Sequence, residues 1–420
     1  MKFRQFLTIL LVLCLSINDE LCTVTYFANE YAIKEFFSLS DLKFNFAISL
    51  YCFGLTIGYV LWTLLYNLIS ECISLILGQI LVIILTIQMF VFPTALGLML
   101  CKFLQGVVIA GFDINIQMYL QKRYNVRADH ILTKVAFVKI AVEAFVPQIV
   151  NILFMFCRNV KFVHITVLIL AISFFVLFQL LVLINTLMYL NQTKFVSSVS
   201  LSVAIRKMYA DIVYVKNHSI AGFVTPKLYL CGICEGMVTI TPIFLEGILT
   251  NIKIRNDYLY NISLTLISVS LLLFLFYFEK YNSKQVVANY QFFSNSILIF
   301  GMIVAPINWI IALTCSVEVY YISVLAWLII YNILSYKTEI YSTTVLQEYF
   351  HEHQPIVIML IGVIEMICST LMSCCVNLFK LTAVNISIFL CILFSVIYAL
   401  INLHFNKKIL HRQSHDIQLV

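Results

Sequence analysis

The sequence contains little charge, little glycine and little proline. Only 11% of its 420 residues are charged and 62% are hydrophobic, against about 25% and about 45–50% in a soluble domain. This composition excludes a soluble globular enzyme. The 34 phenylalanines and 23 tyrosines also exclude a disordered chain, which would be poor in aromatic residues. The chain is therefore expected to be an integral membrane protein, and its length leaves room for roughly a dozen helical spans.

The sequence also lacks the motifs of catalysis, nucleotide binding and metal binding. It contains no phosphate-cradling glycine-rich loop, no nucleophile elbow and no His-Glu-x-x-His motif. Cys231 and Cys234 form a Cys-x-x-Cys pair inside an apolar run, which indicates packing rather than zinc or redox chemistry. His351 and His353 lie in a loop at a spacing unsuited to one helical metal face. We expect no enzyme activity, no metal, no cofactor and no nucleic-acid partner.

Twelve apolar runs are long enough to cross a bilayer as helices. The first run follows Lys2 and Arg4 and could be a secretory signal, but it has no small-x-small cleavage site, so we interpret it as an uncleaved span. The expected spans lie near residues 4–26, 44–66, 71–92, 95–120, 132–157, 163–190, 218–245, 257–278, 291–314, 317–340, 355–379 and 384–405.

Basic residues set the expected orientation of these spans. With the N-terminus inside, the inner loops and termini carry 15 lysines and arginines and the outer loops carry seven. Both termini are therefore predicted to be cytoplasmic. The expected parts are a six-helix half at 1–190, a cytoplasmic linker at 191–217, a second six-helix half at 218–405 and a cytoplasmic tail at 406–420.

The linker contains an amphipathic segment. Its apolar residues recur at helical spacing, while Arg206, Lys207 and Lys216 fall off that stripe. The pattern predicts a helix on the inner membrane surface rather than an ordinary linker. The stripe consists of Leu201, Ile205, Met208, Ile212 and Val215.

Two segments stand out within the expected spans. Residues 49–62 read SLYCFGLTIGYVLW, in which Gly54 and Gly58 form a small-xxx-small face that lets another helix approach closely. Residues 102–111 read KFLQGVVIAG and place Lys102 inside a span. A cation in a span is costly and usually faces the bundle interior or a partner.

With the twelve spans, these segments resemble the major facilitator superfamily and, within it, the bicyclomycin-resistance-type (Bcr/CflA) drug:proton antiporters. In the fourth span, Lys102, Gln105 and Gly106 match the Arg-x-x-Gln-Gly pattern of that family, with lysine replacing arginine. The residues that match the second-span pattern are Ser49, Tyr51, Gly54, Gly58 and Trp62.

The resemblance implies an all-α membrane fold with two six-helix halves. It also implies a secondary transporter that exports small amphipathic compounds or drugs in exchange for protons by alternating access. The expected partners are a small-molecule substrate, protons and membrane lipid, and the expected state is a monomer in a bacterial cytoplasmic membrane.

The chain departs from the family in its cytoplasmic loops. Residues 63–72 have lost almost every charge of the loop that latches the first half in the family. In the second half, Glu279, Lys280 and Lys284 keep the acidic and basic signs of that loop. They are the latch candidates, although they could equally be a charged loop that caps two spans.

Acidic residues inside the spans are the candidates for proton coupling, because a carboxylate shielded from water can load a proton on one side and release it on the other. Glu365 has no obvious partner on its own helix, whereas Glu143 can pair with Lys139. The resemblance implies that the helices of Glu20, Asp113 and Glu235 line the central cavity. Water at the ends of these helices could also solvate the three carboxylates. The candidates are Glu365, Glu20, Asp113, Glu235 and Glu143.

Three other functions fit parts of the sequence. A proton-coupled importer would have the same fold, and the altered motifs permit it. A degenerate, non-transporting paralogue would explain the lost charges of residues 63–72. A membrane-embedded polysaccharide polymerase would need a long outer loop with clustered arginine or histidine, and no outer loop here is long enough.

Overall fold

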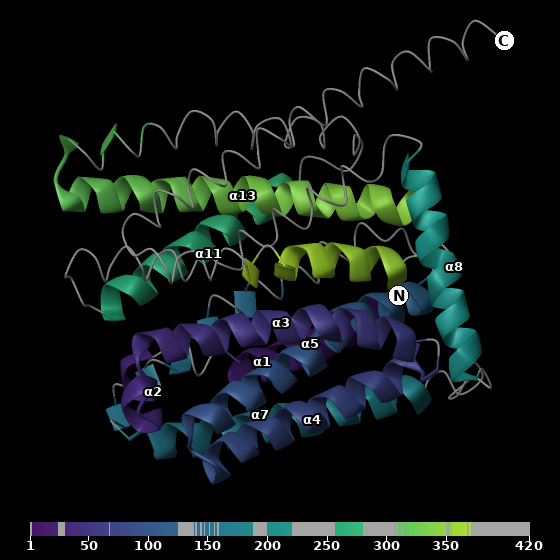
Figure 1. Ribbon diagram of the computed structural model, residues 1–420, viewed down its shortest axis with the longest axis horizontal. Helices are drawn as coiled ribbons and strands as arrows, with labels where there is room; N and C mark the ends of the chain where they lie inside the picture. Colours follow the sequence, from purple (N-terminus) through teal and green to yellow (C-terminus); the bar gives the residue numbers. More distant parts are fainter. Residues whose placement is uncertain are drawn as a thin grey trace, which may run out of the picture. The chain divides into compact units, whose positions relative to one another are not determined.

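In the computed structural model, almost all of the described residues form α-helices (Figure 1). The described residues are 2–23, 30–66, 68–124, 159–187, 200–220, 257–279, 314–349, 353 and 355–367, with single residues and short pieces between 138 and 157 and at 307, 310–311 and 369–370. This part of the chain consists of long helices joined by short connections.

The helices of the first half are α1 (Lys2–Thr23), α2 (Glu30–Phe37), α3 (Asp41–Tyr66), α4 (Glu71–Val91), α5 (Ala95–Tyr124) and α7 (Val160–Leu187). The later helices are α8 (Leu201–Ile220), α11 (Asp257–Glu279) and α13 (Val317–Tyr349). Residues 355–367 form a further helical run.

Three described helices are long and apolar enough to cross a membrane: Phe46–Tyr66 in α3, Ala95–Ile116 in α5 and Val160–Ile184 in α7. Large apolar side chains are exposed along their outer faces, such as Phe53, Leu100 and Ile169. A bilayer covers such faces and removes this apolar surface from water. The chain is an integral membrane protein.

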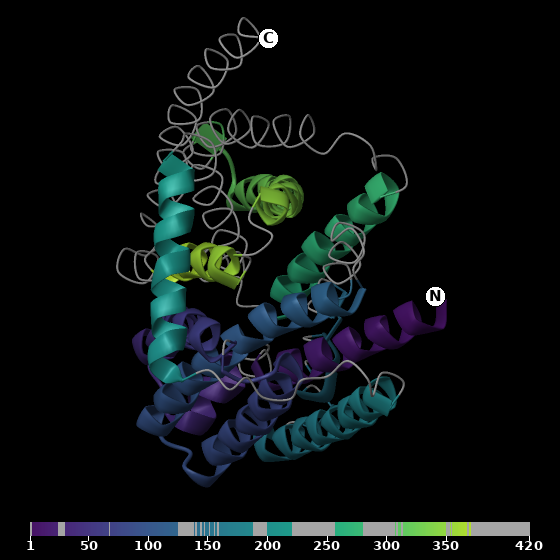
Figure 2. The same cartoon turned by 90° about the vertical axis from the view of Figure 1, so that its right-hand side faces the viewer.

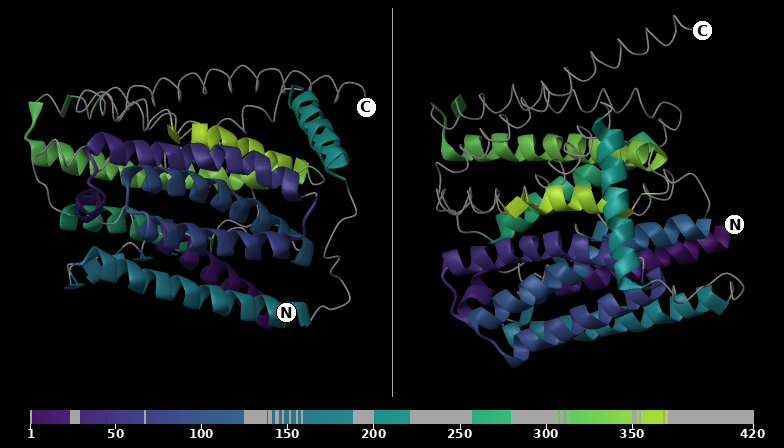
Figure 3. Two further views of the ribbon diagram at one scale, coloured as in Figure 1. Left: turned by 60° about the horizontal axis from the view of Figure 1, so that its bottom comes forward. Right: turned by 45° about the vertical axis from the view of Figure 1, so that its right-hand side comes forward.

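The chain divides into two compact units. The first consists of Met1–Ile205 and Asp257–Leu275, and the second of Arg206–Asn256 and Phe276–Val420. Within the first unit, α3 packs most extensively on α5, α4 also packs on α5, and α1 packs on α7. Figure 3 shows these helices running side by side. We refer to them as the first bundle.

Short-range hydrogen bonds set the turn between α4 and α5. The Phe92 amide donates to the Gln88 carbonyl oxygen over 3.0 Å and closes the last turn of α4. Thr94 then accepts a hydrogen bond from the Gly97 amide at its Oγ1 over 3.0 Å. A threonine before the first helical residue satisfies an otherwise unpaired amide, so the local sequence fixes where α5 begins.

The helix bounds agree closely with the expected spans in the described part. The expected spans 44–66, 71–92 and 257–278 correspond to α3, α4 and α11. Two features were not expected: α2 lies within the first outer connection, and α13 continues nine residues past the expected end at 340. A short helix such as α2 carries no span-length apolar run, so hydropathy alone gives no signal for it.

Candidate functional site

The close packing of α3 on α5 positions the candidate site. A Cβ added at Gly54 would collide with the Phe103 carbonyl oxygen, and one added at Gly58 would collide with the Val107 carbonyl oxygen. In the opposite direction, a Cβ at Gly106 would collide with the Tyr51 carbonyl oxygen. Because no larger residue fits at these positions, the backbones of the two helices are in direct contact.

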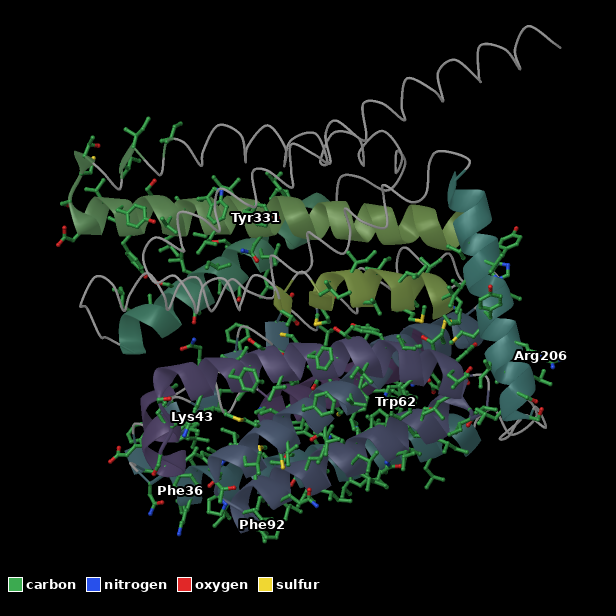
Figure 4. The ribbon with its side chains drawn as sticks, in the orientation of Figure 1. Phe36, Lys43, Trp62, Phe92, Arg206 and Tyr331 are labelled. Atoms are coloured by element: carbon green, nitrogen blue, oxygen red, sulfur yellow. The ribbon has the colours of Figure 1, made fainter. Side chains whose placement is uncertain are left out.

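Trp62 also connects the two helices. Its Nε1 donates a hydrogen bond to the Val107 carbonyl oxygen over 2.8 Å. Its indole ring lies over Gly111, where an added Cβ would approach the ring to 2.5 Å. Trp62 is 3% exposed and is labelled in Figure 4. The second-span and fourth-span segments that stood out in the sequence therefore face each other.

Lys102 lies in α5 beside this contact, and its side chain is only 1% exposed. It is the one Lys, Arg, Asp or Glu among the buried side chains of the part of the chain that the structure describes. Its Nζ lies 6.0 Å from the ring centroid of Tyr51 in α3, at the outer limit for a cation–π contact.

The charged surroundings of Lys102 come from α1 and α5. The carboxylate of Asp19 in α1 acts electrostatically on the Lys102 ammonium, and the thiols of Cys22 and Cys101 lie near it. A buried ammonium is tolerated in a membrane-spanning bundle when an opposite charge is near. Asp19 supplies that charge from another helix.

A chain of polar side chains continues from Lys102 toward α4. Gln105, one helical turn after Lys102, donates from Nε2 to Thr86 Oγ1 over 3.1 Å. Thr86 also interacts with the Cys22 side chain, and the Cys22 thiol donates to Asn18 Oδ1 over 3.8 Å. Three helices, α1, α4 and α5, thus contribute to one buried polar cluster.

Two buried atoms of this cluster have hydrogen-bonding capacity to spare. Among the residues that the structure describes, Asn18 Nδ2 and Gln105 Oε1 have no hydrogen-bond partner. A buried donor and a buried acceptor of this kind are usually satisfied by water or by a ligand. The cluster therefore has the chemistry to bind a polar group next to a cation.

His164 in α7 borders the same cluster. The His164 side chain is buried, and the charge of Lys102 acts on it. The centroid of its ring lies 6.4 Å from that of Phe36 in α2. Hydropathy gave no signal for it, because a single histidine barely changes the average of an apolar helix. Among the described residues, no group of three His, Cys, Asp or Glu side chains could hold a metal ion.

Comparisons with known proteins identify the fold that carries this cluster. No protein-family model matches the sequence, and no curated protein matches it significantly. Solved structures do match. A crystal structure of a bacterial homologue of the iron transporter ferroportin, in the outward-facing state, is similar with a TM-score of 0.70 and 12% identity over 95% of this chain and 98% of that chain.

A second match is the major facilitator superfamily proton:xylose symporter XylE bound to 6-bromo-6-deoxy-D-glucose. Its TM-score is 0.67, with 12% identity over 95% of each chain. The chain has the major facilitator fold. This confirms the predicted all-α, twelve-helix membrane architecture. These structures with the major facilitator fold are transporters and not enzymes.

The proton-coupling candidates are spread over this fold. Glu20 lies in α1 next to Asp19 and is half-buried, and Asp113 lies in α5. Glu365 is half-buried in the helical run 355–367, where its carbonyl oxygen accepts a hydrogen bond from Ser369 Oγ over 2.9 Å. Glu143 and Glu235 lie outside the described residues.

The latch candidates are only partly within the described chain. Glu279 is the last residue of α11, whereas Lys280 and Lys284 lie outside the described residues. Of the three residues of the fourth-span pattern, Lys102 and Gly106 lie beside Tyr51 of α3, whereas Gln105 donates a hydrogen bond to Thr86 of α4. The sequence singled out these residues, but not Asn18 or Thr86. In the sequence, Asn18 and Thr86 are recognisable only as polar residues inside apolar runs, and that pattern alone does not indicate burial.

Proposed function

We propose that this protein is a secondary active transporter that exports small amphipathic compounds in exchange for protons by alternating access. The observation that supports this best is the buried ammonium of Lys102, with the Asp19 carboxylate from another helix near it, in a chain that has the major facilitator fold. A charge buried in a membrane protein is energetically costly, so helix packing alone does not explain a lysine at this position.

Proton coupling can arise because the stability of the buried Lys102 ammonium depends on the charge of the neighbouring Asp19 carboxylate. While the Asp19 carboxylate is ionised, it compensates the Lys102 ammonium. A proton that binds this carboxylate removes the compensation and leaves a buried cation, which is unfavourable until water or another group reaches it. Protonation therefore favours a conformation in which the cluster is hydrated, and proton release favours the closed one.

Other residues have supporting roles in this proposal. Gln105 is held by its hydrogen bond to Thr86. Its Oε1, one helical turn after Lys102, can accept a hydrogen bond from substrate or water. Glu20, Asp113, Glu143, Glu235 and Glu365 remain candidates for a second proton site, and Glu279, Lys280 and Lys284 remain candidates for a cytoplasmic latch.

Import is the second candidate for the direction of transport. It is favoured by the similarity to XylE, a proton:xylose symporter. The two directions differ in whether the substrate moves with the protons or against them. Both need the same coupling residue, so a test of Lys102 alone does not separate them.

The test begins with a thermal-shift screen of purified protein against amphipathic cations, neutral drugs and sugars at several pH values. A compound that stabilises the protein, with a shift that depends on pH, is then loaded into proteoliposomes with an imposed pH gradient. Movement against the protons supports export, and movement with them supports import. A stabilising compound that the gradient does not move in either direction would contradict the proposal and favour a non-transporting paralogue.

A further inference from the structure

From Arg206 onward α8 belongs to the second unit, and one of its sides contacts other residues of that unit. Asp211 Oδ1 lies 3.0 Å from His353 Nδ1, and each side chain is 18% exposed. The His353 ring also packs on the ring of Tyr214, with centroids 4.2 Å apart. Val215, one turn after Asp211, is buried. This side of the helix is therefore occupied by contacts with its own chain.

The other side of α8 is exposed and combines apolar with basic residues. Leu201, Ile205 and Tyr209 are 54%, 47% and 69% exposed, and Arg206 and Lys207 are exposed between them. Figure 4 shows the side chain of Arg206 projecting from the helix. Residues 201–210 contain no Asp or Glu. We call Leu201, Ile205, Arg206, Lys207 and Tyr209 the α8 face.

The direction of α8 suits a membrane surface. Figures 1 and 2 both show α8 running crosswise to α13 of the same unit. An apolar stretch of α13, Glu318–Leu334, belongs to one of the expected spans, so α13 is expected to follow the membrane normal. A helix crosswise to it is then expected to follow the membrane plane. In the predicted orientation, α8 lies on the cytoplasmic side.

We propose that the α8 face binds the headgroups of anionic phospholipids in the cytoplasmic leaflet. Arg206 and Lys207 pair with the phosphates, because anionic lipid attracts basic residues close to the surface. Leu201, Ile205 and Tyr209 enter the boundary between headgroups and acyl chains, as the apolar residues of interfacial helices do. The chemistry of the occupant follows from the residues: a negative headgroup for two exposed cations and an acyl chain for three exposed apolar side chains.

This binding has a consequence for the second unit. Because Asp211 and Tyr214 contact His353, lipid held on the opposite side of α8 is linked through the helix to His353, two residues before the helical run 355–367. The proposal does not depend on the export of amphipathic compounds. A lipid-binding helix of this kind would serve an importer equally well.

The test uses the full-length protein in a mild detergent and three probes: dioctanoyl phosphatidylglycerol, dioctanoyl phosphatidylcholine and glycerol 3-phosphate. Calorimetry is expected to show that phosphatidylglycerol binds at least about tenfold more tightly than phosphatidylcholine. The double variant Arg206→Gln and Lys207→Gln should lose about 30-fold in affinity for phosphatidylglycerol, as expected for two basic residues at a charged surface. Its melting temperature should not change, because both side chains are exposed.

Two further variants complete the test. Lys43→Gln removes an exposed charge from α3, which is not part of the α8 face, and should bind phosphatidylglycerol like the unmodified protein. Tyr209→Ser should weaken the binding of both lipids. Equal affinity for the two lipids, an unchanged affinity in the double variant, or glycerol 3-phosphate binding as tightly as phosphatidylglycerol would overturn the proposal. The last result would mean that the site takes free phosphate and that the apolar residues make no contribution.

Discussion

The indole Nε1 of Trp62 donates a hydrogen bond to the Val107 carbonyl oxygen, 2.8 Å away on the neighbouring helix. This bond joins α3 to α5 beside the glycines at which the two backbones touch. The helix pair is the frame that holds Lys102 in the interior. The buried position of Lys102 therefore depends on how firmly α3 and α5 are held together.

Gly106→Val should destabilise the first bundle, because a Cβ at this position collides with the Tyr51 backbone. Overpacking of this kind costs about 1–3 kcal/mol. The melting temperature in detergent, followed by circular dichroism, should fall clearly below that of the unmodified protein. Ile57→Phe adds bulk at an exposed position of α3 and is the matched control, which should melt like the parent. Equal melting of the Gly106 variant would show that α3 and α5 are farther apart than described.

Trp62→Phe should cost more stability than Trp327→Phe. Both tryptophans are buried, so both substitutions remove a similar apolar volume. Trp62 Nε1 has the Val107 carbonyl as its acceptor, whereas Trp327 Nε1 has no hydrogen-bond partner within the described chain. The net contribution of such a bond is about 0.5–1.5 kcal/mol. Thermal unfolding of the two variants side by side measures the difference, and the reverse order would contradict it.

Asp211→Asn and His353→Gln should show coupling in a double-mutant cycle. The pair is partly exposed, so we expect a coupling free energy of at most about 1 kcal/mol, and less at high salt. The cycle is read from thermal unfolding at low and high ionic strength. Tyr214→Phe keeps the ring that packs on His353 and should leave the coupling in place. Additive single effects would show that the two side chains do not interact in solution.

Lys102→Met should destabilise the protein, because it leaves the Asp19 carboxylate without the ammonium that acts on it. Removing one member of a fully buried charge pair costs about 3–5 kcal/mol, while removing both is often nearly neutral. Because Asp19 is only half-buried, the cost of Lys102→Met should be smaller than this. The double variant Asp19→Asn and Lys102→Met should therefore melt at a higher temperature than Lys102→Met alone. If the second substitution lowers the melting temperature further, the two charges do not compensate each other.

The sequence predicted the spans because hydropathy determines them, and the family resemblance of residues 49–62 and 102–111 implied the major facilitator fold. The spans at 44–66 and 71–92 are recovered as α3 and α4 almost to the residue, since an apolar run of bilayer length has few other structures to adopt. The candidate site was only partly predictable. Lys102 stood out as a charge in a span, but its neighbours Asn18 and Thr86 come from helices whose register against α5 the sequence does not specify.

His353 shows the opposite limit. Its spacing from His351 excluded a helical metal site and favoured a solvated loop. In the structure its ring contacts Asp211 and Tyr214, which are about 140 residues earlier in the chain. Pairings over such a separation depend on tertiary structure, and a single sequence contains no pattern that reports them.

The most direct test of the account is proton-driven transport by the Lys102→Met variant. Inside-out vesicles with an acidic interior are supplied with a compound that stabilises the purified protein, and its accumulation is followed with and without a protonophore. The account predicts that the unmodified protein accumulates the compound only while the gradient lasts. It also predicts that Lys102→Met still binds the compound but accumulates none. Accumulation by Lys102→Met at the unmodified rate, abolished by the protonophore, would contradict the role of Lys102 in coupling.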